Sequence, residues 1–263
     1  MPYGLYTREA AEYFGYTCED DLAEGGLRAL DLGSTVVFGA SGAIVGAAAG
    51  YHALGAVMIG LITTVGGGTL RDAIVAGRPA FWFRDLPYLW LGLYGGVIGV
   101  FLAHTELANW EPVVSLMWWL DTIALSVFAA VGARWTLNAI SPLYPVILFA
   151  TLLTCCGGGM VRDTLCRRPI RIFDGTKEMY AECAVSGAAV YTAVLRAGFG
   201  PVACVAACMT TVFTLRSAAT AFDLRVPCVV EVKAPAPVAA APAPEKPFDP
   251  LESLRRPTAV RGV

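Results

Sequence analysis

Long apolar stretches alternate along the chain with short segments that hold most of its charged residues. A helix needs about 20 apolar residues to cross a bilayer, and Leu32–Tyr51 contains no charged residue. The same pattern recurs and predicts an all-α membrane protein with seven transmembrane helices. The expected spans are Leu32–Tyr51, Ala53–Ala76, Leu86–Ala103, Val113–Leu137, Pro142–Cys166, Met179–Leu195 and Phe199–Ala221.

Composition supports a multi-pass integral membrane protein and divides the chain into three parts. Of 263 residues, 56% are hydrophobic and only 15% are charged, whereas soluble domains have about 25% charged residues. Residues 1–27 form a polar, mildly acidic extension without the pattern of a cleaved signal peptide. Residues 28–226 hold the predicted spans, and the Pro/Ala-rich residues 227–263 are expected to be a disordered tail. The distribution of Lys and Arg favours a cytosolic C-terminus, and the compartment stays open.

The eight cysteines do not change this interpretation. Most of them lie in apolar segments, where a free cysteine behaves as a small hydrophobic residue. We therefore expect no metal site at these cysteines. No cofactor and no nucleic-acid partner are expected for the chain. The spans are expected to lie in a lipid bilayer.

An internal repeat organises the spans. Asp31, Phe38 and Gly42 recur 90 positions later as Asp121, Phe128 and Gly132. The repeats cover residues 29–105 and 113–197 with three spans each, and a seventh helix, 199–221, stands outside them. Because three is odd, the second repeat enters the membrane from the opposite side, which predicts two inverted repeats.

Each repeat contains three consecutive glycines in its middle span, in TTVGGGTLRDAIVAGRP and TCCGGGMVRDTLCRRP. A glycine inside a helix costs about 1 kcal/mol relative to alanine, and freed backbone is tolerated in a membrane only beside protein or a water-filled cavity. We therefore expect helices two and five to be broken or kinked at the triplets, with carbonyls available to a cation. The alternative is that the glycines only allow helices to approach closely. The candidate pore-lining and hinge residues are Gly66, Gly67, Gly68, Gly157, Gly158 and Gly159.

An Arg-Asp pair follows each triplet, Arg71–Asp72 and Arg162–Asp163. Because neighbouring residues diverge around a helix, we expect crossed ion pairs, Arg71 with Asp163 and Arg162 with Asp72. In the alternative, both pairs lie at the membrane interface, where arginine binds lipid headgroups and aspartate caps a half-helix.

Three further charged residues are candidates for the interior. Asp31 and Asp121 match between the repeats, and an intramembrane carboxylate usually faces a cavity or a cation. Asp31 could instead be a favourable charge at a helix N-terminus. Arg134, near the end of the fourth span, either lines the interior or extends to the interface.

The doubled GGGxxRD motif, each copy preceded by a span like LDLGSTVVFGASGA and followed by a basic-Pro turn, resembles the prokaryotic-type TRIC (trimeric intracellular cation) channel family. The resemblance covers about 29–221. It implies a seven-helix inverted-repeat fold, a homotrimer, and one potassium-permeable pore in each subunit, lined by the two glycine triplets. The TCC before the second triplet and the CRRP after it depart from the family pattern.

The predicted function is therefore a passive channel for monovalent cations, with potassium as the permeant ion. The alternative is a secondary carrier for a small solute such as an amino acid, with Arg71 or Arg162 holding its carboxylate. An enzyme is disfavoured, because the sequence has no nucleophile–base constellation, metal-ligand set or phosphate-binding loop. A pure scaffold also remains open.

Overall fold

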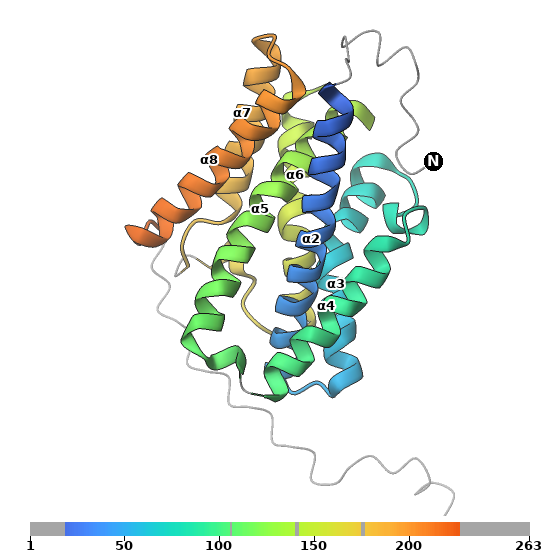
Figure 1. Cartoon of the computed structure of the whole chain (residues 1–263), viewed down its shortest axis with the longest axis vertical. Coiled ribbons are helices and arrows are strands. Elements are labelled where there is room, and N and C mark those ends of the chain that lie inside the picture. The colour runs from blue at the N-terminus through green and yellow to red at the C-terminus, as the bar shows by residue number, and fades with distance from the viewer. Residues whose placement is uncertain (1–18, 106, 140–141, 175–176, 227–263) are drawn as a thin grey trace, which may run out of the picture. The chain divides into compact units, whose positions relative to one another are not determined.

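The computed structural model describes residues 19–105, 107–139, 142–174 and 177–226 (Figure 1). Nearly all of this part of the chain is helical, which confirms the predicted all-α class. Its seven α-helices are α2 (Glu19–Ala48), α3 (Ala53–Arg71), α4 (Pro87–His104), α5 (Glu111–Ala139), α6 (Tyr144–Leu165), α7 (Ala181–Arg196) and α8 (Pro201–Ala221). A π-helical turn, η1 (Asp72–Ala76), continues α3, and three 3-10 helices lie in connections: η2 (Phe81–Phe83), η3 (Leu107–Asn109) and η4 (Arg171–Phe173).

Length and apolar composition make the chain a multi-pass integral membrane protein. Within the described residues, six helices are long and apolar enough to cross a membrane, namely α2, α3 with η1, α4, α5, α6 and α8. The remaining helix of the predicted seven, α7, has 16 residues. This is shorter than the about 20 residues that span a bilayer without tilt or thinning.

The first helix begins earlier than the sequence analysis predicts. α2 starts at Glu19, whereas the first span was expected to start at Leu32 and residues up to 27 were assigned to a polar extension. Four acidic residues stand within the first two turns, in EDDLAE, and negative charge stabilises the positive end of a helix dipole. The other predicted spans agree with the helices to within a few residues. Residues 1–18 and the predicted tail, 227–263, lie outside the described residues.

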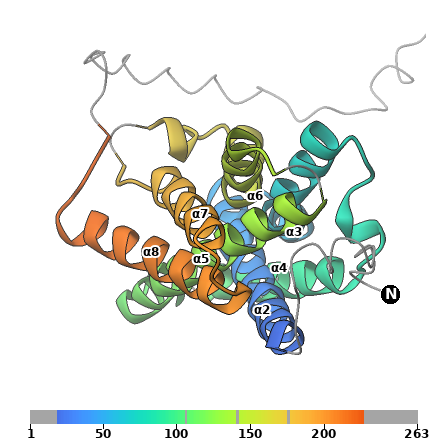
Figure 2. The same cartoon turned by 90° about the horizontal axis from the view of Figure 1, so that it is seen from above.

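The helices pack as two groups of three that meet through equivalent members. α2, α3 and α4 contact one another, and so do α5, α6 and α7. Between the groups, α2 contacts α5 and α3 contacts α6, while α8 packs on α5 and α7. The view from above shows α2, α3 and α4 on one side and α7 and α8 on the other (Figure 2). Contacts between equivalent helices are what a two-fold relation between repeats requires, so they support the inverted-repeat prediction, which stays a prediction.

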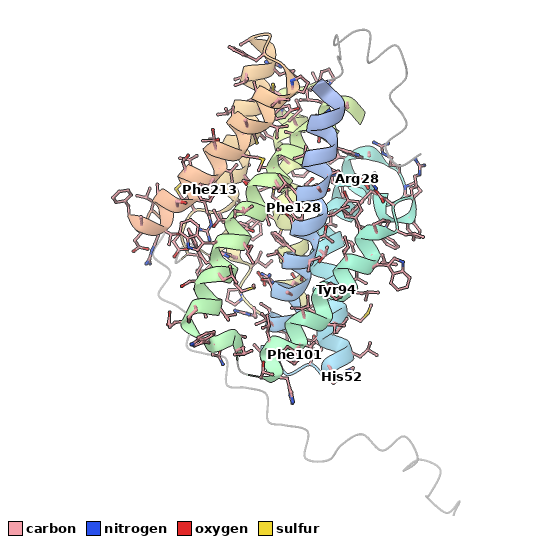
Figure 3. All side chains as sticks on the ribbon, viewed as in Figure 1. Arg28, His52, Tyr94, Phe101, Phe128 and Phe213 are labelled. Atoms are coloured by element: carbon pink, nitrogen blue, oxygen red, sulfur yellow. The ribbon has the colours of Figure 1, made fainter. Side chains whose placement is uncertain are left out.

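The interior of the bundle contains aromatic, aliphatic and small residues, and many other large apolar residues face outward. At the crossing of α2 and α5, the equivalent residues Phe38 and Phe128 bring their ring centroids to 4.9 Å. Phe128 is labelled in Figure 3. On α4, Tyr94 and Phe101 are each 61% exposed. Exposed aromatics on a spanning helix match the lipid-facing surface of a membrane protein.

Candidate functional site at the glycine triplets

Both triplets lie inside uninterrupted helices. α3 is helical through Gly66–Gly68 and α6 is helical through Gly157–Gly159. The predicted break in helices two and five is therefore wrong, and a kink within a continuous helix stays a prediction. The physical reason is that no water competes for backbone hydrogen bonds in a membrane interior, so glycine does not loosen a helix there as it does in water.

The first two glycines of each triplet form a close contact between α3 and α6, which we call the glycine seam (Gly66, Gly67, Gly157 and Gly158). A Cβ atom added to Gly66 would lie 3.2 Å from the Cα atom of Gly158. One added to Gly157 would lie 3.0 Å from the Cα atom of Gly67. One added to Gly158 would lie 2.9 Å from the carbonyl carbon of Thr63. Backbone packs directly on backbone, so these four positions fit the close-approach alternative.

The third glycine of each triplet has a different neighbour in the two halves. A Cβ atom on Gly68 would lie 2.9 Å from Cδ1 of Phe81. Around Gly159 the nearest atom is Nη2 of Arg162, at 3.6 Å, and Gly159 borders a cavity of about 200 Å³. We call this the α6 cavity. It is lined by Phe38, Ser41, Met117, Trp118, Asp121, Cys155, Cys156, Gly159, Met160, Arg162, Asp163, Ile170, Arg171, Ile172 and Tyr180.

Each arginine pairs with the aspartate that follows it. Nη2 of Arg71 lies 2.8 Å from Oδ1 of Asp72, and Nη2 of Arg162 lies 2.8 Å from Oδ1 of Asp163. The expected crossed pairs are therefore wrong. Although adjacent positions diverge around a helix, the long arginine side chain bends back across the last helical turn to its neighbour.

The second carboxylate oxygen of each aspartate binds the loop that follows the helix. This contact explains why an aspartate stands directly after each arginine. Oδ2 of Asp72 accepts a hydrogen bond of 2.7 Å from the backbone N–H of Phe81. Oδ2 of Asp163 accepts one of 3.3 Å from the backbone N–H of Arg171. Both bonds fix the start of the 3-10 helix in the loop beyond, so each aspartate joins its arginine to that loop. The alternative interpretation expected each aspartate to cap a half-helix. The aspartates do act as caps, and the elements that they cap are the 3-10 helices.

The two arginines differ in their surroundings. The guanidinium carbon of Arg71 lies 3.6 Å from the ring centroid of Trp135 and 5.9 Å from that of Phe81. Its side chain is 5% exposed, against 15% for Arg162, which lines the α6 cavity. The first half is thus closed by aromatic rings, and the second half leaves its ion pair beside open space.

Asp31 and Asp121 each meet a tyrosine that the sequence analysis did not single out. The hydroxyl of Tyr88 donates a hydrogen bond to Asp31, and that of Tyr180 donates one of 3.3 Å to Asp121. Both tyrosines follow their aspartate by nearly the same interval, so the repeat itself carried a signal for them. Asp121 lines the α6 cavity, and Asp31, which is 5% exposed, does not.

Two arginines on other helices are also buried. Arg134 of α5 is 7% exposed, which favours the interior position over the alternative that it extends to the membrane surface. Arg216 of α8 is fully buried, a feature that sequence reasoning missed. Its Nη1 atom donates to the carbonyl of Met179 at 3.2 Å and lies 3.6 Å from Oε2 of Glu178. Within the part of the chain that the structure describes, no group of His, Cys, Asp or Glu is placed to hold a metal ion.

The sequence and the fold are similar to those of known proteins. A family model described as "Glycine transporter" matches residues 28–104 and 118–196, one match for each repeat. The chain belongs to this family. The two matched segments together cover more than half of the sequence and include both triplets and both Arg-Asp pairs.

Relatives in this family are bacterial membrane proteins. A UPF0126 membrane protein of Deinococcus radiodurans is 34% identical over 168 residues, which are 64% of this chain and 75% of that protein. One of Vibrio cholerae is 32% identical, covering 65% of this chain and 69% of the relative. The inner membrane protein YadS of Escherichia coli is 31% identical, covering 62% and 75%.

Solved structures of TRIC channels share the fold. The TRIC trimeric intracellular cation channel orthologue from Rhodobacter sphaeroides superposes with a TM-score of 0.66 at 29% identity, covering 75% of this chain and 98% of that one. A second TRIC cation channel superposes with a TM-score of 0.70 at 23% identity, covering 79% and 98%, a likeness of fold. The resemblance to the TRIC-type family noted from the doubled motif is confirmed.

The glycine seam predicts a sharp difference between adjacent glycines of one triplet. Gly158→Ala would force a methyl group into the Thr63 carbonyl, so we expect a loss of roughly 1–3 kcal/mol in the free energy of unfolding. Gly159→Ala, whose nearest neighbour is 3.6 Å away, should leave the free energy of unfolding nearly unchanged. Equilibrium unfolding in mixed micelles measures both. Equal stabilities for the two variants would contradict close backbone contact at Gly158.

Proposed function

We propose that the protein is a passive channel for monovalent cations, with potassium as the permeant ion, and that ions pass along the glycine seam. The observation that carries the proposal is a contact of bare backbone between α3 and α6, next to a cavity lined by Asp121, in a fold shared with TRIC cation channels. Channels of this class are not enzymes, in agreement with the absence of catalytic motifs from the sequence.

The seam can part at low cost because its four glycines carry no side chains that could interlock. Two equivalent threonines border it, Thr63 beside Gly158 and Thr154 beside Gly67. Each threonine hydroxyl donates to the carbonyl four residues earlier, at 2.7 Å. The Thr63 hydroxyl oxygen therefore keeps lone pairs for a cation, whereas the Thr154 hydroxyl oxygen also accepts a hydrogen bond from Nη1 of Arg71 at 3.5 Å. Selectivity filters use such oxygens to replace the hydration shell of an ion. We infer that separation of α3 from α6 opens the path and that the described conformation is closed.

A second candidate is a secondary carrier for a small amino acid. Two observations favour it, the description of the family as glycine transporters and a cavity lined by side chains of both charges. In a carrier, α3 and α6 would separate along the glycine seam first on one side of the solute and then on the other.

Assembly and orientation belong to the same proposal. We propose a homotrimer, supported by the trimeric state named for the Rhodobacter sphaeroides relative, with a path within each subunit. The C-terminus is proposed to be cytosolic, on the distribution of basic residues.

The deciding experiment is single-channel recording of the purified protein in a planar bilayer with opposed potassium and sodium gradients. We expect unitary currents whose reversal potential is displaced from zero toward the equilibrium potential of potassium. A carrier would give no resolved openings and would show saturable uptake of labelled glycine into proteoliposomes. Absence of unitary currents together with saturable uptake would replace the first candidate by the second.

The carboxylate of Asp121 should matter for conduction. Asp121→Asn removes a negative charge from the wall of the α6 cavity, so the cation current should fall by roughly twofold or more at low salt, and by less at high salt. Asp223→Asn is the matched control, because Asp223 is exposed and pairs with Arg225 outside the spans. Unchanged unitary current in Asp121→Asn would place the path elsewhere.

A further inference from the structure

The two ends of the glycine seam have different surroundings. α3 and α6 run antiparallel along the seam, because the backbone of Thr63 lies beside Gly158 and that of Thr154 lies beside Gly67. The Arg-Asp pair of α3 therefore stands at one end of the seam, and the pair of α6 stands at the other. The α6 cavity adjoins the second pair. We call the opposite end, next to Arg71, the Arg71 end.

Trp135 of α5 covers the Arg71 end. The guanidinium carbon of Arg71 lies 3.6 Å from the centroid of its ring, and that of Arg78 lies 4.5 Å from the same centroid. Two guanidinium groups of the first repeat thus lie against one indole of the second repeat. Tryptophan is the best aromatic partner for a cation, and the attraction grows when the pair is shielded from water. The ring therefore holds both positive charges at this end of the seam.

Arg71 connects this cluster to both helices of the seam. Its Nε and Nη2 atoms donate to Oδ1 of Asp72 at 3.0 Å and 2.8 Å. Its Nη1 atom donates across the seam to the hydroxyl oxygen of Thr154 at 3.5 Å. At this end, α3 cannot move away from α6 unless Arg71 gives up its contacts with Thr154 and Trp135.

The first repeat has no counterpart of this ring to offer the second. The residue equivalent to Trp135, 90 positions earlier, is Val45. Valine has no aromatic face for a guanidinium group, and Arg162, the equivalent of Arg71, borders the α6 cavity. The two repeats thus share the Arg-Asp pair, and only the Arg71 end has an indole over it. A single residue makes this difference, at the place where a closure of the seam would act.

We propose that Trp135 is the gate of the path along the glycine seam, an inference that rests on the channel candidate. The Arg71 end opens when the ring withdraws from Arg71 and Arg78. While the ring is in place, a cation that approaches this end meets two guanidinium groups, and like charges repel. When the ring withdraws, Arg71 is released from the seam, and the hydroxyl oxygen of Thr154 becomes available to the ion.

The first test is single-channel recording of Trp135→Val, which installs the residue of the first repeat. Loss of both cation–π contacts should raise the open probability by roughly tenfold, with the unitary conductance unchanged. Trp135→Phe keeps a ring and should give a smaller increase. Trp119→Val is the matched control on the same helix, because Trp119 is 45% exposed and stacks on Phe213 at 5.8 Å. Its open probability should equal that of the wild type.

The second test measures opening of the seam without any ion current. A charged methanethiosulfonate reagent is applied to Thr154→Cys in detergent, and its attachment at this residue is followed by mass spectrometry. Adding Trp135→Val should accelerate labelling by roughly tenfold, and adding Trp119→Val should not. Should Trp135→Val fail to fold, Arg78→Gln removes one of the two guanidinium groups and should accelerate labelling by roughly threefold.

The two measurements separate the gate from the channel. Unitary currents in the wild type, with open probability and labelling unchanged in Trp135→Val, would overturn the gate and leave the channel in place. Equal effects of Trp135→Val and Trp119→Val would also overturn it. Faster labelling in Trp135→Val without unitary currents in any variant would retain Trp135 as the closure of the seam and reject cation conduction.

Discussion

The structure depends on one contact, that of bare backbone between α3 and α6. Any side chain at Gly67 or Gly158 would meet a carbonyl of the opposite helix, so small residues are required where these helices cross. The contact sets the spacing of α3 and α6. It also leaves the two helices without interdigitated side chains at these glycines. A contact of this kind is well packed when it is closed, and few side chains have to rearrange when it opens.

Around this seam the two repeats have the same plan and different contents. Each has an aspartate bonded to a tyrosine and an Arg-Asp pair joined to the following 3-10 helix. Aromatic rings close the first copy over Arg71, and the second copy keeps a charged cavity beside Arg162. The two halves differ at Trp135 and Arg171, so the bundle is asymmetric around the glycine seam.

Local pattern predicted the helices and the family, and three-dimensional packing decided the rest. Apolar stretches and the doubled GGGxxRD motif were enough to predict the fold, because helix length and repeated motifs can be recognised in short stretches of sequence. The crossed ion pairs failed because the reach of an arginine side chain outweighs the angular separation of neighbours. The break at the glycines failed because propensity measured in water does not apply where the opposite helix covers the backbone. Trp135, Arg171 and Arg216 were missed, since their partners lie on helices that are distant in sequence.

The most direct measurement of the central claim is modification of a thiol placed at Gly159, the one glycine of the triplets that borders the α6 cavity. Cys155 and Cys156 line the same cavity, so the background carries alanine at both. A charged methanethiosulfonate reagent should label Gly159→Cys and reduce the cation current as labelling proceeds, with no effect on the background protein. Complete labelling with an unchanged current would show that ions do not pass through the α6 cavity beside the glycine seam.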